Sequence, residues 1–227
     1  AMVAIYTYHN MAGEKAGRND YQTQGIAYST DKGRTWIKYE KNPVLQNPGQ
    51  RDFRDPKVSW NAETKKWITT LASGDHVCFY SSPNLKDWSL ESEFGTGIGA
   101  HGGVWECPDL FELPVASSKG EKKWILLVSI NHGRPNGGSA TQYFIGKFDG
   151  HKFSNETSEI NWMDWGKDNY AGVTFSDIPE SDGRRILIGW MSNWQYAQVV
   201  PTVKWRSAMT FPRELKLVSE NNKYLLI

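Results

Sequence analysis

An internal repeat of about fifty residues constrains the fold of this chain more than any other feature. Residues 28–36 (YSTDKGRTW) are matched by residues 80–88 (YSSPNLKDW), and the Arg-Asp-Pro at 54–56 is matched by the Glu-Cys-Pro at 106–108. Each of the latter two motifs is followed by a short apolar strand, a polar turn, Lys-Lys-Trp-Ile and a second apolar strand. A period of this length that holds several short strands is typical of β-propellers.

The repeat predicts four units of antiparallel strands. They run from Met2 to Gln46, from Arg54 to about Gly95, from Glu106 to about Phe153 and from Tyr170 to about Leu217. Their apolar runs are short, rich in β-branched and aromatic residues, and bounded by Gly, Pro, Asn and Asp. No segment has a sustained helical period of apolar residues. The chain is therefore predicted to be all-β, and on the repeat alone a β-sandwich is the alternative to a propeller.

Composition excludes several partners. The formal net charge is +1, which gives no electrostatic reason to expect nucleic acid or an anionic membrane as partner. No apolar run is long enough to span a bilayer. Cys78 and Cys107 cannot make a disulfide framework and lack metal-ligand spacing, so two buried free thiols, no metal site and no cofactor are expected.

Eleven tryptophans could serve either as packing residues or as platforms that stack on sugar faces. Those at repeat-equivalent positions are assigned to packing between blades. They are Trp36, Trp67, Trp88 and Trp124. Both interpretations stay open for Trp162, Trp165, Trp190, Trp194 and Trp205.

Asp55 and Glu106 begin equivalent strands of neighbouring units if the repeats are structural equivalents. Paired carboxyl groups suit acid–base chemistry on a sugar. The apolar neighbours of Glu106, such as Trp105 and Pro108, favour its protonated form by desolvation. Arg54 favours the ionised form of Asp55. The alternative is that both acids are structural residues at strand starts.

A set of motifs, taken in order, resembles glycoside hydrolase family 32, which holds invertases, inulinases, levanases and fructan exohydrolases. The motifs are the Arg-Asp-Pro at 54–56, Glu-Cys-Pro-Asp-Leu at 106–110, Asp-Trp-Gly-Lys-Asp-Asn-Tyr-Ala at 164–171, Gly-Trp-Met-Ser-Asn-Trp at 189–194, Trp-Arg-Ser-Ala-Met at 205–209 and Pro-Arg-Glu-Leu at 212–215. The set covers nearly the whole chain. Its Asn-Trp-Gln-Tyr and Asp-Asn-Tyr-Ala forms are most similar to the microbial levanase and exo-inulinase branch.

The resemblance implies a five-bladed β-propeller, of which this chain supplies about four blades as an incomplete catalytic domain over residues 1–227, with no second domain present. It implies a retaining β-fructofuranosidase-type hydrolase acting on fructans (levan, inulin) or sucrose. It also favours a secreted, periplasmic or cell-surface location.

The resemblance also assigns roles to individual residues. Glu106 is the implied general acid/base and Asp55 the implied transition-state stabiliser, with Arg54 helping to hold the fructosyl ring. Trp194 is implied as a wall of the fructosyl subsite, and Asp164 and Lys167 as residues toward the leaving group.

The sequence departs from the family pattern in its first part. The family's nucleophile lies in an N-terminal Trp-Met-Asn-Asp-Pro-Asn-Gly motif that this sequence lacks, and the usual C-terminal β-sandwich is also missing. A fragment is therefore expected, with the missing N-terminal blade as a possible separate segment. Two alternatives stay open: a non-catalytic carbohydrate-binding remnant, and a related five-bladed inverting glycosidase acting on arabinan or xylan.

We expect the isolated chain to show negligible fructosidase activity, because without the nucleophile no covalent fructosyl intermediate can form. Assays of the isolated chain on sucrose, inulin and levan check this. Turnover on the order of 1–1000 per second would contradict the expectation and imply a nucleophile that the motif search missed.

Overall fold

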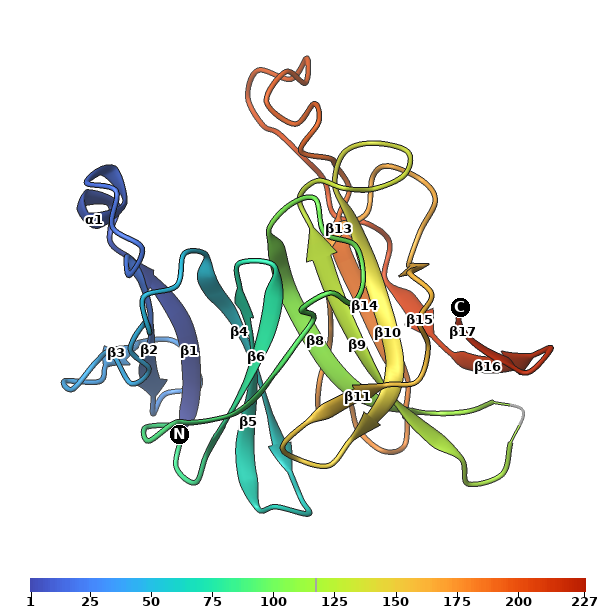
Figure 1. The fold of residues 1–227 in the computed structure, drawn as a ribbon. Coiled ribbons are helices and arrows are strands. Elements are labelled where there is room, and N and C mark those ends of the chain that lie inside the picture. The colour runs from blue at the N-terminus through green and yellow to red at the C-terminus, as the bar shows by residue number, and fades with distance from the viewer. Residues whose placement is uncertain (117) are drawn as a thin grey trace. The chain divides into compact units, whose positions relative to one another are not determined.

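The structure, a computed structural model, describes residues 1–116 and 118–227. The chain divides into two compact units, Ala1–Phe94 with Gly150–Lys152, and Gly95–Asp149 with Phe153–Ile227. Almost all regular structure is β-strand (Figure 1). Among the described residues the single helix is α1 (Met11–Lys15), and no helix is long and apolar enough to cross a membrane.

The first unit holds two antiparallel sheets. The three-stranded sheet has the order β1-β2-β3, from Met2–His9, Gln22–Ser29 and Ile37–Lys38. The four-stranded sheet has the order β4-β5-β6-β7, from Phe53–Asn61, Lys66–Ser73, His76–Ser82 and Ser89–Phe94. A two-residue turn joins β5 to β6, and Gly74 adopts the positive φ of 66° that such tight hairpin turns require.

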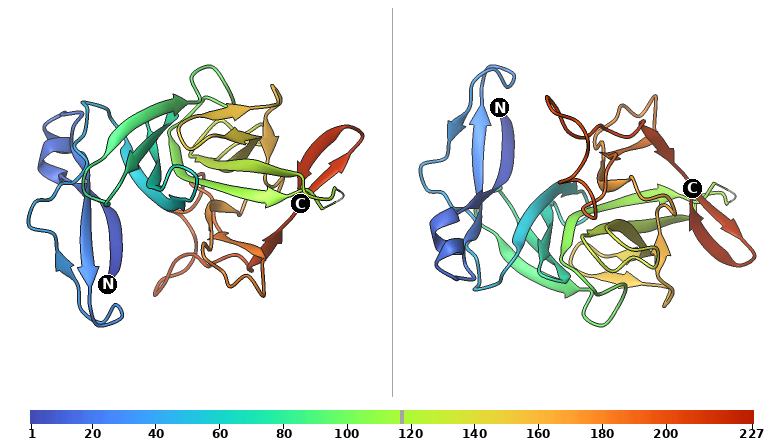
Figure 2. Two further views of the ribbon diagram at one scale, coloured as in Figure 1. Left: turned by 90° about the horizontal axis from the view of Figure 1, so that it is seen from below. Right: turned by 90° about the horizontal axis from the view of Figure 1, so that it is seen from above.

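The second unit holds two further antiparallel sheets and a hairpin. One sheet has the order β11-β10-β9-β8, with β12 also paired to β10. Its strands are β8 (Trp105–Pro114), β9 (Lys122–Ile130), β10 (Ala140–Phe148), β11 (Phe153–Asn155) and β12 (Asn161–Trp162). The other has the order β13-β14-β15, from Tyr170–Thr174, Arg185–Trp190 and Arg213–Leu215. The hairpin of β16 (Leu217–Glu220) and β17 (Lys223–Leu226) lies beside the end of β8, where Leu217 bridges Val115 (Figure 2).

Each unit has its own apolar core. The strands β9 and β10 are buried on both faces over most of their length, which explains their near-continuous apolar sequences. The core cluster of the second unit consists of Phe111, Leu113, Val115, Ile125, Leu127, Tyr143, Ile145, Leu187, Leu215 and Leu217. That of the first unit consists of Leu45, Phe53, Leu71, Cys78 and Tyr80.

The four sheets coincide with the four units predicted from the repeat, and the all-β prediction is confirmed. The predicted role of the repeated tryptophans is only partly right. Trp36 and Trp88 each donate the indole N–H to the carbonyl three residues earlier, at 3.0 and 3.1 Å, so both belong to the same repeated turn. Trp36 is 43% exposed, however, and does not pack in a core.

A β-bulge recurs at the start of three strands, β4, β8 and β13. In each bulge, two residues of the bulged strand lie opposite a single residue of the partner strand. The register shifts between Arg54 and Lys57, between Glu106 and Asp109, and between Tyr170 and Val173. The first bulged residue has a positive φ each time: Asp55 at 62°, Cys107 at 48° and Ala171 at 51°. Asp55 and Glu106 do start equivalent strands, as predicted, but they are not at equivalent positions. Arg54 is the equivalent of Glu106, and Asp55 is the equivalent of Cys107.

Asp109 connects two sheets within the second unit. Its carboxylate on β8 is 1% exposed and accepts hydrogen bonds from the backbone N–H and the hydroxyl of Thr174 on β13, at 2.6 and 2.8 Å. Burial lowers the pKa of Arg185, and the charge of Asp109 opposes that effect. A buried carboxylate satisfied in this way fixes one strand against the other.

We expect Asp109→Asn to lower the free energy of unfolding by about 1.5–3 kcal/mol, because an amide keeps only part of the charge-assisted hydrogen bonding. Glu112→Gln is the matched control. Glu112 lies on the same strand but is exposed, with Lys122 at 2.9 Å, and a surface pair of this kind contributes at most about 1 kcal/mol. Urea denaturation of both variants measures the difference, and equal losses would contradict the role given to Asp109.

Candidate active site

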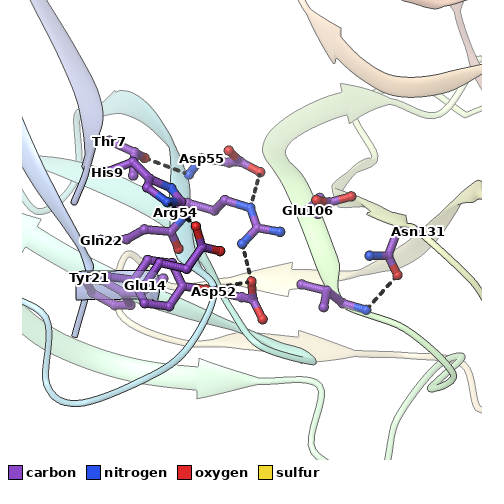
Figure 3. A network of polar contacts seen from close by, with 12 residues as sticks. Thr7, His9, Glu14, Tyr21, Gln22, Asp52, Arg54, Asp55, Glu106 and Asn131 are labelled. Carbon is purple, nitrogen blue, oxygen red and sulfur yellow. Dashed lines mark hydrogen bonds and ion pairs between the residues drawn. The ribbon is translucent and has the colours of Figure 1, made fainter. Parts of the chain in front are cut away.

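Arg54 lies between two carboxylates in the first unit (Figure 3). Its Nη1 donates to Asp52 Oδ1 at 2.5 Å, and its Nε lies 4.0 Å from Asp55 Oδ2. The three side chains are 19 to 30% exposed, so they are partly shielded yet reachable from solvent. Tyr21 donates a further, long hydrogen bond of 3.4 Å to Asp52. The guanidinium therefore places a positive charge beside the carboxylates of Asp52 and Asp55.

The backbone of Asp55 is held from the neighbouring sheet. Its N–H donates to Thr7 Oγ1 at 3.2 Å, and Thr7 donates to Gln24 Oε1 at 2.8 Å. The amide of Gln24 donates in turn to the carbonyl of Phe53 at 2.9 Å. This series of bonds stabilises a left-handed conformation that costs a residue with a Cβ about 1–2 kcal/mol.

Glu106 in the second unit is in direct contact with Tyr170. The tyrosine hydroxyl donates a hydrogen bond to Glu106 Oε2. Trp105, the residue before Glu106, is fully buried, donates its indole N–H to the carbonyl of Ala100 at 2.9 Å, and stacks on His101 at 5.3 Å between ring centroids. Just before Trp105 in the sequence, the backbone N–H of Val104 donates a hydrogen bond to the side-chain oxygen of Asn131 at 3.0 Å (Figure 3). Glu106 thus extends from a strand whose preceding residue is fully buried, and the Tyr170 hydroxyl is directed at its carboxyl group.

Contacts between aromatic rings connect Tyr170 to Trp194 through Trp190. Tyr170 lies 6.2 Å from Trp190 and Trp190 lies 5.0 Å from Trp194, both in edge-to-face arrangements. Trp194 is 43% exposed, so one side of its ring is available to a ligand. Edge-to-face pairs of this kind fix ring orientations, which suits a tryptophan that has to present a flat apolar surface.

Asn193 anchors the loop that carries Trp194. This side chain is fully buried, and its amide bonds the backbone of Ser139 and the carbonyl of Lys167 at 2.9 to 3.1 Å. Lys167 in turn donates through Nζ to Gln195 Oε1 at 2.6 Å, next in sequence to Trp194. Lys167 and Trp194 are therefore brought to the same region of this unit.

Asp164 makes intramolecular contacts of its own. Its Oδ2 accepts from Arg213 Nη1 at 2.8 Å and its Oδ1 accepts the N–H of Gly166 at 2.7 Å, while Asn169 lies 3.4 Å away. Arg134 donates to the carbonyls of Asp164 and Gly166 at 2.7 and 2.5 Å. Partial burial opposes ionisation, but the bonds from Arg213 and Gly166 outweigh it and hold the pKa of Asp164 below its usual range.

The predicted residues therefore fall into two groups, Arg54 with Asp55 in the first unit and Glu106, Asp164, Lys167 and Trp194 in the second. Their catalytic and binding roles stay predictions. Sequence reasoning missed Tyr170 as the partner of Glu106, although its place at the start of the fourth repeat was a usable signal. It also treated both thiols as buried, whereas Cys107 is only half-buried.

Sequence comparisons identify relatives with an established activity. The profile of the glycosyl hydrolases family 32 N-terminal domain matches residues 1–227. The chain is 56% identical to a levanase of Bacillus subtilis (strain 168), over 95% of this chain and 31% of the levanase. It is 42% identical to an extracellular exo-inulinase of Aspergillus awamori, over all of this chain and 46% of the exo-inulinase.

Solved structures agree with these matches. The exo-inulinase of Aspergillus awamori superposes with a TM-score of 0.88 at 40% identity, over 99% of this chain and 47% of that one. The fructofuranosidase of Schwanniomyces occidentalis complexed with fructose superposes with a TM-score of 0.87 at 38% identity, over 99% of this chain and 43% of that one.

The fold and the matches define a β-propeller protein of the glycoside hydrolase class, and the predicted fold class is confirmed. The chain belongs to glycosyl hydrolase family 32. It spans less than half the length of the curated relatives named above.

We expect Asp164→Asn to destabilise the second unit in a pH-dependent way. Because the folded-state pKa of Asp164 is lowered, its carboxylate contributes stability above the unfolded-state pKa of about 3.9, and that contribution is lost as pH falls through the lower folded-state value. Urea denaturation across pH 3 to 8 (roughly) checks this, and the difference from wild type should shrink below about pH 4. Asp168→Asn, an exposed carboxylate in the same loop, is the control; a pH-independent effect of Asp164→Asn would contradict the prediction.

Proposed function

We propose that this chain carries the acid/base and sugar-binding residues of a retaining β-fructofuranosidase-type glycoside hydrolase that acts on fructans (levan, inulin) or sucrose. The observation that carries the proposal is the recurrent bulge, which presents Arg54 with Asp55 on β4 and Glu106 on β8, the latter in contact with Tyr170 from β13. The named relatives are levanases, exo-inulinases and fructofuranosidases, which favours fructan over arabinan or xylan.

In the proposed mechanism Glu106 protonates the glycosidic oxygen as the leaving group departs and later takes a proton from water. The Tyr170 hydroxyl holds the carboxyl group in one rotamer, which maintains the direction of proton transfer. Retention requires a nucleophilic carboxylate about 5–5.5 Å from the acid, which the resemblance places in the family's N-terminal motif.

Asp55 is proposed to stabilise the oxocarbenium-like transition state through fructosyl hydroxyls, with Arg54 keeping it ionised and oriented. The exposed face of Trp194 forms a wall of the fructosyl subsite. Lys167, linked to Gln195 beside that wall, lies toward the leaving group in this proposal. Asp164 contributes by holding the 164–169 loop through Arg213.

The remaining expectations follow from the relatives. We propose that residues 1–227 form most of one catalytic domain, and that the protein is secreted, since exo-inulinases among its relatives are named extracellular.

Two substitutions and two substrates test the assigned roles, in a catalytically competent polypeptide that contains this chain together with the family's Trp-Met-Asn-Asp-Pro-Asn-Gly motif. We expect Glu106→Gln to lower activity on the natural substrate by about 100- to 10,000-fold, and far less on an activated aryl fructoside that departs with little protonation. Asp55→Asn should impair both substrates and lower kcat more than it raises KM.

The comparison has two outcomes that would overturn the roles. If Glu106→Gln lowers activity equally on both substrates, Glu106 is not the general acid. If Asp55→Asn keeps most of its activity, Asp55 is not the transition-state stabiliser. Glu112→Gln, an exposed carboxylate on the same strand as Glu106, controls for loss of charge.

A further inference from the structure

Three potential metal ligands lie on one face of the β6–β7 hairpin. His76 and Cys78 are two residues apart on β6, and in a strand residues at i and i+2 point to the same face. Glu93 on β7 pairs directly with Cys78, so its side chain points to that face as well. The antiparallel register therefore brings together an imidazole, a thiol and a carboxylate.

The ligand atoms of these three side chains all lie within 4.8 Å of one another. Four-coordinate zinc takes bond lengths of about 2.0–2.3 Å to nitrogen, oxygen and sulfur, so its ligands sit roughly 3.3–3.8 Å apart. Small rotamer changes, of the order of an ångström at the side-chain tips, would close the difference. Sulfur, imidazole and carboxylate together form a set that suits zinc better than calcium or magnesium, which prefer oxygen ligands.

The surroundings provide what a metal site needs. Glu93 is exposed, which gives an ion access from solvent, whereas Cys78 is 3% exposed in the core of this unit. Asp75 Oδ1 lies 3.8 Å from His76 Nδ1, longer than a hydrogen bond, and on metal binding it would have to move closer to orient the imidazole. Ser73 lies opposite His76 in the register, and its fully buried hydroxyl lies close to the Cys78 thiol.

We propose that the β6–β7 hairpin binds Zn²⁺ through Cys78 Sγ, His76 and Glu93, with the fourth position open to water. On binding, the Cys78 S–H bond breaks, an S–Zn bond forms and the proton passes to solvent. Binding would connect β6 to β7 independently of the glycosidase site. Cysteine spacing predicted no metal site, because the third ligand lies fifteen residues beyond Cys78 and joins it only through strand pairing.

The thiol has to be deprotonated to act as a ligand. Burial raises the pKa of Cys78 to about 12, and the nearby Ser73 hydroxyl opposes this only in part. Part of the binding energy of the metal is therefore spent on displacing this proton, so a weaker affinity is expected than for zinc sites with pre-ionised thiols.

Co²⁺ substitution tests the proposal on this chain. Titration with Co²⁺ should produce a thiolate-to-metal charge-transfer band and the visible absorption of a four-coordinate ion, and Zn²⁺ should abolish both at one equivalent. Cys78→Ser should remove the charge-transfer band, whereas Cys107→Ser, which changes the other thiol, should keep it.

Glu93→Gln is a second test of the site, because Cys78 lies in the core and its substitution could unfold the chain, whereas Glu93 is exposed. We expect it to weaken Zn²⁺ binding by at least about 10-fold, and Asp75→Asn by about 10- to 100-fold, the range known for partners of metal ligands. Glu63→Gln, an exposed carboxylate in the same unit, should bind as wild type. Absence of stoichiometric binding, a band that survives Cys78→Ser, or equal effects of Glu93→Gln and Glu63→Gln would each overturn the proposal.

Discussion

The β-bulge at the start of β4, β8 and β13 is the constraint on which both parts of the candidate site depend. An extra residue in a strand breaks the regular alternation of side chains and redirects those beside it. The left-handed residue in each bulge carries a Cβ, which costs energy unless the surroundings hold it. The bonds through Thr7 do so at Asp55, and they belong to a different sheet from the bulge that they support.

Polar side chains, more than apolar contacts, set the positions of the loops around these strands. Asn193 and Arg134 are almost completely buried. Arg134 donates to the carbonyls of Asp164 and Gly166, and Asn193 donates to the carbonyls of Lys167 and Ser139. A buried amide or guanidinium loses its hydrogen bonds if the loop moves, so the loop has a single favourable position. Trp194 can therefore be largely exposed and still be well oriented.

The repeat in the sequence predicted the sheets because each sheet is built from local hairpins whose apolar alternation and turns are visible in a linear chain. It placed Asp55 and Glu106 at strand starts for the same reason. The alignment of the two tripeptides already sets Asp55 one residue after the position of Glu106, but it could not show the bulge there, since a bulge changes register without changing composition. Nor could it show the pairing of Glu106 with Tyr170 or of Asp164 with Arg213, because these contacts join residues far apart in sequence.

Asp109 lies three residues after Glu106 on β8, and Thr174, which it binds, lies four residues after Tyr170 on β13. The carboxylate that connects the two sheets thus also sets the spacing between Glu106 and the tyrosine that contacts it. Opening β13 alone would break both hydrogen bonds to the buried carboxylate of Asp109, so the two strands are expected to open together. A change at Asp109 or Thr174 therefore acts on the positions of Glu106 and Tyr170 together.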